Sequence, residues 1–355
     1  MRGRRAFLAG LLASGAVPGV SWADAGAPSY LTAAMTSQEH YVLAGLRSDG
    51  TLAFTQPLPD RGHASAAHPT QPEAVAFARR PGTYALVLDC VTGRVTQRLT
   101  APKGHHFYGH GAFSTDGTHL FTTENHISSG QGRIGVWARA RGYARIAEFA
   151  SGGIGPHEIL RLPGQDVLAI ANGGILTRPE TGRDKLNLPT MRPNLTMMTG
   201  DGQIVDQAAL PDADHQNSLR HIAAFADGRV ACGFQWQGDP WASPALVGVY
   251  QPGRGLRLLD SPEPATRRLT AYVGSVAALP EGQIAVTSPR GGVVQLFDPV
   301  AGFRAQSPQT DICGIGAGPG GALATDGLGG VHQVGAGLRR LHTHGLAFDN
   351  HLVAI

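Results

Sequence analysis

Charged side chains are scarce in this chain of 355 residues, in which Asp, Glu, Lys and Arg together account for only 15%. Aromatic residues make up 6%, there are three cysteines, and no apolar run reaches the roughly 20 residues of a membrane-spanning helix. A strongly basic surface for nucleic acid is therefore excluded, and so is a scaffold held together by a network of disulfides. We expect no membrane span.

The small net charge of +3 comes from one end of the chain. Arg2, Arg4 and Arg5 lie within the first 23 residues, which contain no acidic residue, so the remainder carries 26 basic and 26 acidic side chains. This balance indicates no nucleic acid as a partner and is compatible with a monomer, which is the state we expect.

Residues 1–23 have the layout of an export signal, with a basic start, an apolar stretch and small residues near the end. Arg4–Leu8 (RRAFL) resembles the RRxFL pattern of twin-arginine signals, which direct folded proteins to the periplasm. Cleavage is expected after Ala23 or Ala25, and residues 24–355 then form a single mature domain. A general secretory signal with a chance pair of arginines is the alternative.

Short motifs of common enzyme classes are also lacking. The chain has no P-loop, dinucleotide-binding, Gly-x-Ser-x-Gly, Cys-x-x-Cys or His-Glu-x-x-His sequence. The number of cysteines is odd, with residues at Cys90, Cys232 and Cys313. Two of them, Cys90 and Cys232, lie in or beside strand-like runs. We predict that these cysteines are small buried hydrophobic residues and form no disulfide framework.

Glycine and proline are abundant, with 49 and 24 residues, and they separate short β-branched runs such as YALVLD and QIAVTS. No window shows the 3.6-residue period of an amphipathic helix with comparable strength. Seven stretches of the sequence can be aligned with one another on the turn that follows each of them. They begin at His63, His110, His157, His221, Ser275, Cys313 and His344. Four antiparallel strands per unit, repeated seven times, predict an all-β fold, a seven-bladed β-propeller.

The seventh unit ends after HGLAFDNHLVAI, which supplies only two strands. Two strand-like runs, 40–47 and 51–58, are left over ahead of the first unit. Pairing the two ends would cover both exposed strand edges, so we predict a last blade closed by N- and C-terminal strands. Two stacked β-sandwich domains are the rival arrangement, and they leave the sevenfold repeat unexplained.

The third unit carries a polar, proline-rich insertion at residues 176–193. Insertions of this kind lie on one face of a propeller and are often functional. One hypothesis is therefore a scaffold that docks another exported protein through this segment, and a loop without a role is the alternative.

Several irregular motifs are spread along the mature chain. They include GHGAFSTDG (109–117), FTTEN (121–125), GIGPHE (153–158), RPETGRDKLNL (178–188) and TSPRGG (287–292). In their order the chain resembles the bacterial domain-of-unknown-function family 1513, exported proteins expected to be seven-bladed propellers. The resemblance implies a genomic context, because such genes commonly neighbour imelysin-like iron-uptake proteins and a di-haem oxidoreductase-like protein. A periplasmic role accessory to iron (or copper) acquisition, with an imelysin-like partner, is the resulting expectation.

Histidine begins five of the seven aligned units. The first strand of each propeller blade lines the central channel, so residues in one register would form a ring around the axis. His63, His110, His157, His221 and His344 are therefore candidate ligands for Fe, Cu or Zn, because neutral imidazole suits these metals. Since a seven-membered ring is too wide for one ion, we expect three or four histidines of adjacent blades to bind it.

Other groups near this register are expected to support the ligands or to react themselves. His105, His106 and Glu158 are candidates to orient the metal-bound histidines. A lactonase- or lyase-like enzyme that uses His110 or His157 as general base, with Glu158 as a further catalytic candidate, is an alternative function. Hydrogen bonding of the histidines within their own blades is the third interpretation.

Overall fold

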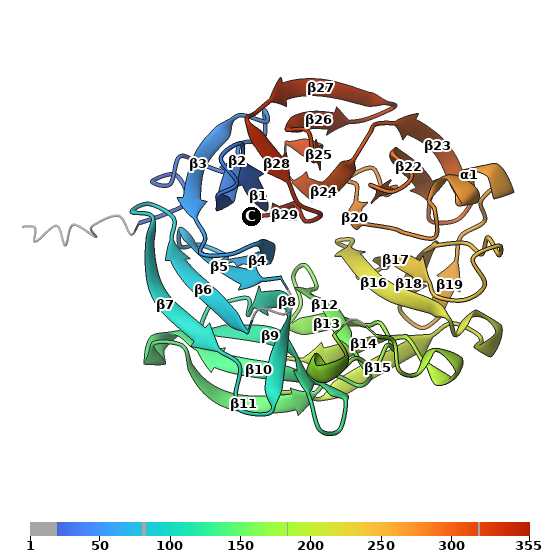
Figure 1. The fold of residues 1–355 in the computed structure, drawn as a ribbon, viewed down its shortest axis with the longest axis horizontal. Coiled ribbons are helices and arrows are strands. Elements are labelled where there is room, and N and C mark those ends of the chain that lie inside the picture. Colours follow the sequence, from blue (N-terminus) through green and yellow to red (C-terminus); the bar gives the residue numbers. More distant parts are fainter. Residues whose placement is uncertain (1–19, 80–82, 183, 319) are drawn as a thin grey trace, which may run out of the picture.

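The computed structural model describes residues 20–79, 83–182, 184–318 and 320–355. Its strands form seven antiparallel sheets arranged in a ring, which confirms the predicted all-β, seven-bladed propeller (Figure 1). Most of the predicted signal sequence, residues 1–19, lies outside the described residues. No helix in the described part of the chain combines the length and hydrophobicity needed to cross a membrane.

Six blades follow one another along the chain, each with its first strand innermost (Figure 1). Blades 1 to 3 comprise β4 (Gly62–Ala67), β5 (Glu73–Ala78), β6 (Tyr84–Asp89), β7 (Arg94–Thr100), β8 (His105–Phe113), β9 (His119–His126), β10 (Gln131–Ala138), β11 (Ala144–Ala150), β12 (Pro156–Arg161), β13 (Val167–Asn172), β14 (Asn194–Thr199) and β15 (Ile204–Ala209). Blades 4 to 6 comprise β16 (Asn217–Ala224), β17 (Val230–Trp236), β18 (Val247–Gln251), β19 (Gly255–Leu258), β20 (Ser275–Ala278), β21 (Ile284–Ser288), β22 (Val293–Asp298), β23 (Gly302–Pro308), β24 (Ile312–Gly318), β25 (Gly321–Asp326), β26 (Gly330–Val334) and β27 (Leu338–Thr343).

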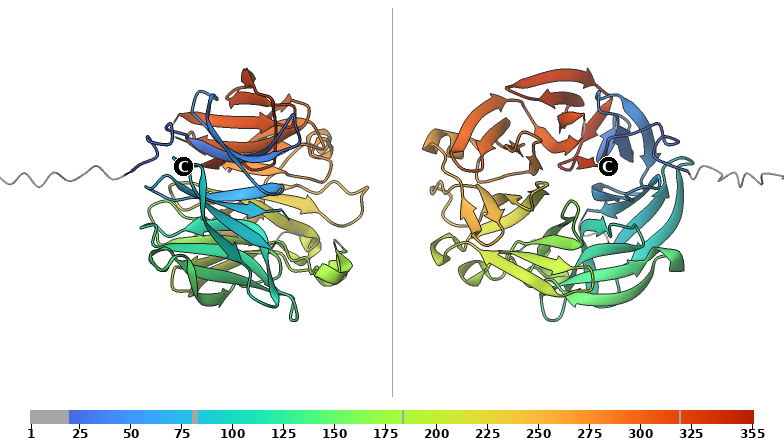
Figure 2. Two further views of the ribbon diagram at one scale, coloured as in Figure 1. Left: turned by 60° about the vertical axis from the view of Figure 1, so that its left-hand side comes forward. Right: turned by 180° about the vertical axis from the view of Figure 1, so that it is seen from behind.

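The seventh sheet, here called the composite blade, contains strands from both ends of the chain. They are β1 (Tyr30–Thr36), β2 (Tyr41–Leu46), β3 (Leu52–Pro57), β28 (Leu346–Phe348) and β29 (Val353–Ala354). β28 and β29 both pair with β1 on its inner edge. The N-terminal part therefore supplies three strands instead of the two predicted, and β1 is the additional one. Figure 2 shows the ring from two further directions, with the C-terminal end close to its inner side.

The described helices are all short and lie in connections between strands. They are α1 (Glu263–Arg268) and the 3-10 turns η1 (Arg139–Arg141), η2 (Pro179–Thr181), η3 (Leu188–Thr190) and η4 (Asp212–Asp214). The predicted insertion, 176–193, contains η2 and η3 and is tied to the blade by Asn187, which accepts from Leu176 N and donates to Gly174 O. This segment is therefore a hydrogen-bonded connection between β13 and β14.

The turn between β8 and β9 shows why the Asp-Gly pairs recur. Gly117 has a positive φ of 71°, which costs glycine little, and its N–H donates to Ser114 O. The Asp116 carboxylate accepts from Ser114 Oγ at 2.6 Å and from Thr118 N at 3.0 Å. The side chain of Asp116 thereby satisfies polar groups of a tight hairpin that leads away from the channel.

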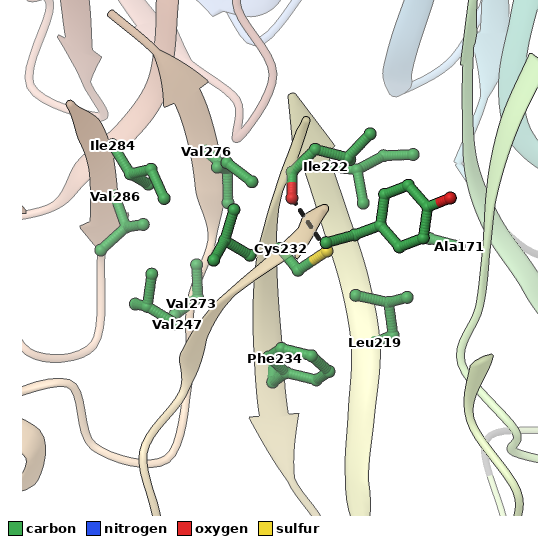
Figure 3. Packing of buried hydrophobic residues seen from close by; sticks show 14 of the residues in the cluster. Ala171, Leu219, Ile222, Cys232, Phe234, Val247, Val273, Val276, Ile284 and Val286 are labelled. Atoms are coloured by element: carbon green, nitrogen blue, oxygen red, sulfur yellow. Dashed lines mark hydrogen bonds between the residues drawn. The ribbon is translucent and has the colours of Figure 1, made fainter. Parts of the chain in front are cut away.

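Apolar residues pack between neighbouring blades, as Figure 3 shows for blades 3 to 5. Leu219, Cys232, Phe234 and Val273 are each completely buried in this cluster. Alternate residues of each strand face this packing because side chains alternate along a strand. The three cysteines are buried and free, as the sequence predicted, and Cys232 Sγ lies 3.7 Å from Val230 O.

Tyr30 joins the composite blade to blade 6, because its buried ring packs beside Leu323 and its hydroxyl donates to Gly321 O at 2.7 Å. We expect Tyr30→Phe to lower the free energy of unfolding by about 1 kcal/mol, the net value of one hydrogen bond. Tyr30→Ala, which also removes the ring, is expected to cost about 3–5 kcal/mol. Urea unfolding of the three proteins measures both differences. If both variants lost the same free energy of unfolding, the separate contributions of the hydroxyl and the ring would be contradicted.

Candidate metal centre

The inner strands of the propeller are irregular where the histidines occur. Strand register shifts between Gly62 and Ser65 in β4, between Phe107 and Gly111 in β8, and between Pro156 and Glu158 in β12. A further shift lies between Leu219 and His221 in β16. A β-bulge leaves an extra residue outside the ladder and redirects its side chain. The bulges therefore explain how several consecutive side chains of one strand can face the channel.

Hydrogen bonds that close the first hairpin of blades 1 to 5 give the alignment of these blades. The closing donors are the N–H groups of His68, Ser114, Leu162, Phe225 and Leu279. The residues four positions before these donors are Ala64, His110, Glu158, His221 and Ser275. The residues five positions before them are His63, Gly109, His157, Arg220 and Gly274. The histidines thus occupy two adjacent positions, which we call the near register (four back) and the far register (five back).

The expectation of a single shared position was therefore wrong for His63 and His157. Gly164 follows Leu162 after two residues, whereas Gly117 and Gly228 follow their closing donors after three. Counting from the glycine consequently moved His157 by one position relative to His110 and His221. The structure nevertheless brings His63, His110, His157 and His221 together, because the two registers are neighbours on the same bulged strands.

His63, His110 and His157 each offer one nitrogen within 4.8 Å of the other two. His110 Nε2 faces His63 Nε2 at 3.3 Å. Two nitrogens bound to one tetrahedral zinc, at about 2.0–2.1 Å each, would be about 3.3 Å apart. The pair of imidazoles is therefore already spaced as metal ligands are.

Two local features hold this group in place. His157 Nδ1 lies 3.0 Å from Arg220 O, a contact that directs its other nitrogen elsewhere. Gly109 has a φ of 95°, and a Cβ there would lie 2.6 Å from His63 Cδ2. Glycine at 109 is thus required both by the backbone conformation and by the close approach of the His63 ring.

Glu158 lies beside the histidines, in the near register of blade 3. Its Oε2 accepts from Ile222 N at 3.1 Å and lies 3.2 Å from His221 Nδ1. Its Oε1 lies 4.0 Å from His110 Nδ1. The carboxyl group is thereby fixed by blade 4 on one side and presents its second oxygen to His110.

A fifth histidine of the cluster, His351, comes from the C-terminal segment and was not singled out in the sequence. Its ring centroid lies 4.5 Å from that of His110 and 4.6 Å from that of His63. Asp349 anchors this segment to blade 1 through Arg61 at 2.8 Å, and Asn350 Nδ2 donates to Tyr272 Oη at 3.0 Å. The segment between β28 and β29 is thus held from two sides, which places His351 beside the other histidines.

His344 lies elsewhere, although its place in the repeat predicted a position in the ring. Its Nε2 lies 2.9 Å from Gly50 O, and its ring stacks on that of His342 at 5.8 Å. The C-terminal unit does not continue the regular repeat, since β28 is only three residues long and pairs with β1. His351, seven residues farther along the chain, lies in the cluster instead.

The two histidines expected to support the cluster have partners in blade 2. His105 Nε2 lies 3.2 Å from Glu148 Oε2, and Asn125 Nδ2 lies 3.1 Å from His106 Nε2. His105, Glu124 and Glu148 also offer ligand atoms within 4.8 Å of one another. Arg145 lies among them, at 2.6 Å from Glu124 and 3.0 Å from Glu148, so a guanidinium already neutralises these carboxylates.

A cavity of about 370 Å³ extends along the channel from the near register. His110, Glu158, Ser275 and His351 line it, together with small apolar residues of the inner strands. His63 and His157, in the far register, are not among its lining residues. One side of the histidine cluster therefore faces an open space that admits small ligands, and the half-buried His63 and His157 lie beyond it.

Burial controls the protonation of the cluster. It holds the pKa of His110 and of His157 well below the ordinary range, and neighbouring imidazoles or Arg220 add repulsion. Burial lowers the pKa of His221 to about 3 and that of His351 to about 4. The same desolvation raises the pKa of Glu158 to about 7. The imidazoles are neutral at pH 7 and keep the lone pairs that a metal requires, while Glu158 can exchange a proton near neutrality.

These pKa shifts make the metal-free protein sensitive to acid. The unfolded chain binds a proton on each histidine near pH 6.5, whereas His221 and His351 stay neutral in the folded chain down to about pH 3 and 4. Stability is therefore expected to fall as the pH drops below about 6.5, by up to about 1.4 kcal/mol per pH unit for each proton. The raised pKa of Glu158 has the opposite effect, because it increases stability as the pH falls from about 7 to 4.5. The loss of stability from the four histidines is larger than this gain.

Urea unfolding in chelator at pH 7, 6, 5 and 4.5 measures this dependence. His351→Gln is expected to lower the slope, whereas His40→Gln, at an exposed position outside the cluster, is the matched control and is expected to leave it unchanged. A wild-type protein that is equally stable at pH 7 and pH 4.5 would contradict the assignment of neutral, buried histidines.

Comparisons with known proteins agree with this architecture. In the solved structures, the hydrazine synthase of Kuenenia stuttgartiensis is similar with a TM-score of 0.58 and 13% identity, over 85% of this chain and 93% of that one. A chain of a mitotic checkpoint complex is similar with a TM-score of 0.54 and 11% identity, over 78% of each chain. At these identities the likeness shows the fold alone. No curated protein matches the sequence.

The sequence also matches the model of the family described as protein of unknown function (DUF1513), over residues 56–355. The match covers blades 1 to 6, the C-terminal segment with His351, and the end of β3. It includes all five clustered histidines and Glu158. On this match, the chain belongs to the DUF1513 family.

Proposed function

We propose that this protein is an exported propeller that binds a transition-metal ion at its histidine cluster and assists metal acquisition outside the cytoplasm. His63, His110 and His157 hold the ion in this proposal. His221 and Glu158 orient their neighbours, through the contact between His221 Nδ1 and Glu158 Oε2. The observation that carries the proposal is the 3.3 Å separation of the His63 and His110 Nε2 atoms, together with the burial that keeps His110 neutral.

The ligand set favours iron, copper or zinc. Imidazole nitrogen suits all three metals, whereas calcium and magnesium prefer oxygen ligands. Three histidines with a carboxyl group nearby lack the thiolates that select soft ions, and no cysteine belongs to the ligand groups found among the described residues.

The place of action is inferred from the sequence. Residues 1–23 have the features of a twin-arginine signal, and this route carries proteins that are already folded. A metal site assembled from four blades and the C-terminal segment would then be complete before export. The genomic neighbourhood of the family supports iron (or copper) acquisition as the process and an imelysin-like exported protein as the partner.

Elemental analysis of the protein purified after export tests the metal site. We expect at least one ion of Fe, Cu or Zn per chain in the wild-type protein. The His110→Ala/His157→Ala variant is expected to lose at least 90% of this content because two of three imidazoles are gone. His344→Gln is the matched control, since His344 contacts Gly50 O outside the cluster, and it is expected to keep the ion. Metal-free wild-type protein, or metal retained in the double variant, would overturn the proposal.

Replacement of the arginine pair tests the route of export. Arg4→Lys/Arg5→Lys keeps the positive charge and removes the guanidinium pair, so we expect at least a tenfold drop of the protein in the periplasmic fraction. Arg2→Lys, in the same basic start, is the control and is expected to leave export unchanged. Undiminished export of the double variant would show that a general secretory signal operates.

A further inference from the structure

The histidine cluster contains two sets of ligand atoms that share one residue. His63, His110 and His157 form the first set, and His110, Glu158 and His351 form the second, each within 4.8 Å. We propose that the protein binds two metal ions, one in each set, bridged by the imidazole ring of His110. This inference rests on the metal binding proposed above and adds a second, differently coordinated ion.

The two nitrogens of His110 face different sets. Its Nε2 lies 3.3 Å from His63 Nε2, and its Nδ1 lies 4.0 Å from Glu158 Oε1. These nitrogens lie on different edges of the ring, so a single ion cannot use both. A neutral imidazole carries one N–H proton and one nitrogen lone pair. Binding at both nitrogens releases that proton to solvent and leaves an imidazolate that two cations stabilise.

Glu158 is positioned to complete the second set. Its Oε2 is held by Ile222 N at 3.1 Å and lies 3.2 Å from His221 Nδ1, which leaves Oε1 directed toward His110. A carboxylate fixed through one oxygen can bind an ion through the other without losing its support. The side chain of Glu158 keeps 19% of its surface exposed, on the wall of the channel cavity.

His351 supplies an independent indication of a ligand. The residue is only 4% exposed, and within the described part of the chain its Nε2 has no hydrogen-bond partner. A buried polar nitrogen without a partner is unfavourable, and coordination of an ion would satisfy it. The anchoring of this segment by Asp349 and Asn350 holds the imidazole there in the absence of any bond from Nε2.

The second ion would face the channel cavity. The three residues of the second set all line the cavity of about 370 Å³, whereas His63 and His157 do not. Three protein ligands leave at least one coordination position open, and here that position faces the cavity. The second ion can therefore take a small oxygen-donor ligand, such as water or a carboxylate, from the channel.

Metal stoichiometry separates this inference from the proposed function. Metal-free protein is titrated with Zn²⁺ and with Cu²⁺, and the ions retained after gel filtration are counted. We expect two ions per chain in the wild type and one in Glu158→Gln and in His351→Gln. His344→Gln is the control and is expected to retain two. Circular dichroism and melting curves identify any variant that fails to fold.

Each result has a defined meaning. One ion in the wild type, unchanged in Glu158→Gln, overturns the second site and leaves the proposed function standing. No retained ion overturns both, and two ions in every variant overturn the assignment of Glu158 and His351.

Electron paramagnetic resonance of the copper-loaded protein tests the bridge itself, independently of affinity. Two Cu²⁺ ions joined by an imidazolate couple magnetically, so we expect at least a fivefold lower spin count than the copper content in the wild type. In His351→Gln, with a single ion, the spin count is expected to equal the copper content. Two uncoupled spins per wild-type chain would overturn the bridging role of His110.

Discussion

The pairing of β28 and β29 with β1 is the contact on which the candidate site depends. It joins the two ends of the chain in one sheet, and it also brings the connection between β28 and β29 to the inner side of the ring (Figure 1). Asp349, on this connection, forms an ion pair with Arg61 of blade 1 while its N–H donates to Ala33 O. The histidine that completes the cluster is thus positioned by backbone pairing and by the ion pair of Asp349 with Arg61.

Bulges in the inner strands allow side chains of both the near and the far register to approach the channel. A regular strand would present every second residue to the channel, and consecutive residues such as His157 and Glu158 would then face opposite sides. The register shift between Pro156 and Glu158 leaves His157 outside the ladder and lets both side chains approach the axis. The far register gathers His63 and His157 away from the cavity, and the near register places His110 and Glu158 on its wall. One local irregularity, repeated in neighbouring blades, therefore places some of the clustered side chains on the cavity wall and others beyond it.

The sequence was sufficient to predict the fold, the buried cysteines and the convergence of four histidines, because these depend on repeated local patterns. Short alternating strands recur in every blade and Asp-Gly turns in most of them, so errors in one unit do not change the prediction. The exact register could not be predicted, since the turn glycine lies two residues after Leu162 but three residues after Ser114 in hairpins of equal length, and only backbone hydrogen bonds reveal this. His351 was missed for another reason. Its position follows from tertiary anchors at Arg61 and Tyr272, which have no signature in the local sequence.

A buried histidine with a purely structural role is present in the same molecule and provides the comparison. His332 is 2% exposed, and its Nε2 lies 2.8 Å from the carboxylate of Asp326, which also accepts from Gly330 N at 2.7 Å. That arrangement satisfies the ring within blade 6, which is how a folded chain ordinarily accommodates an imidazole. In the channel cluster, by contrast, His110 faces another imidazole through one nitrogen and a carboxyl oxygen 4.0 Å away through the other. Burial there keeps His110, His221 and His351 neutral, and within the described residues the Nε2 of His351 has no hydrogen-bond partner. A buried nitrogen of this kind is unfavourable in the folded chain, and a cation at the cluster, as we propose, would satisfy it.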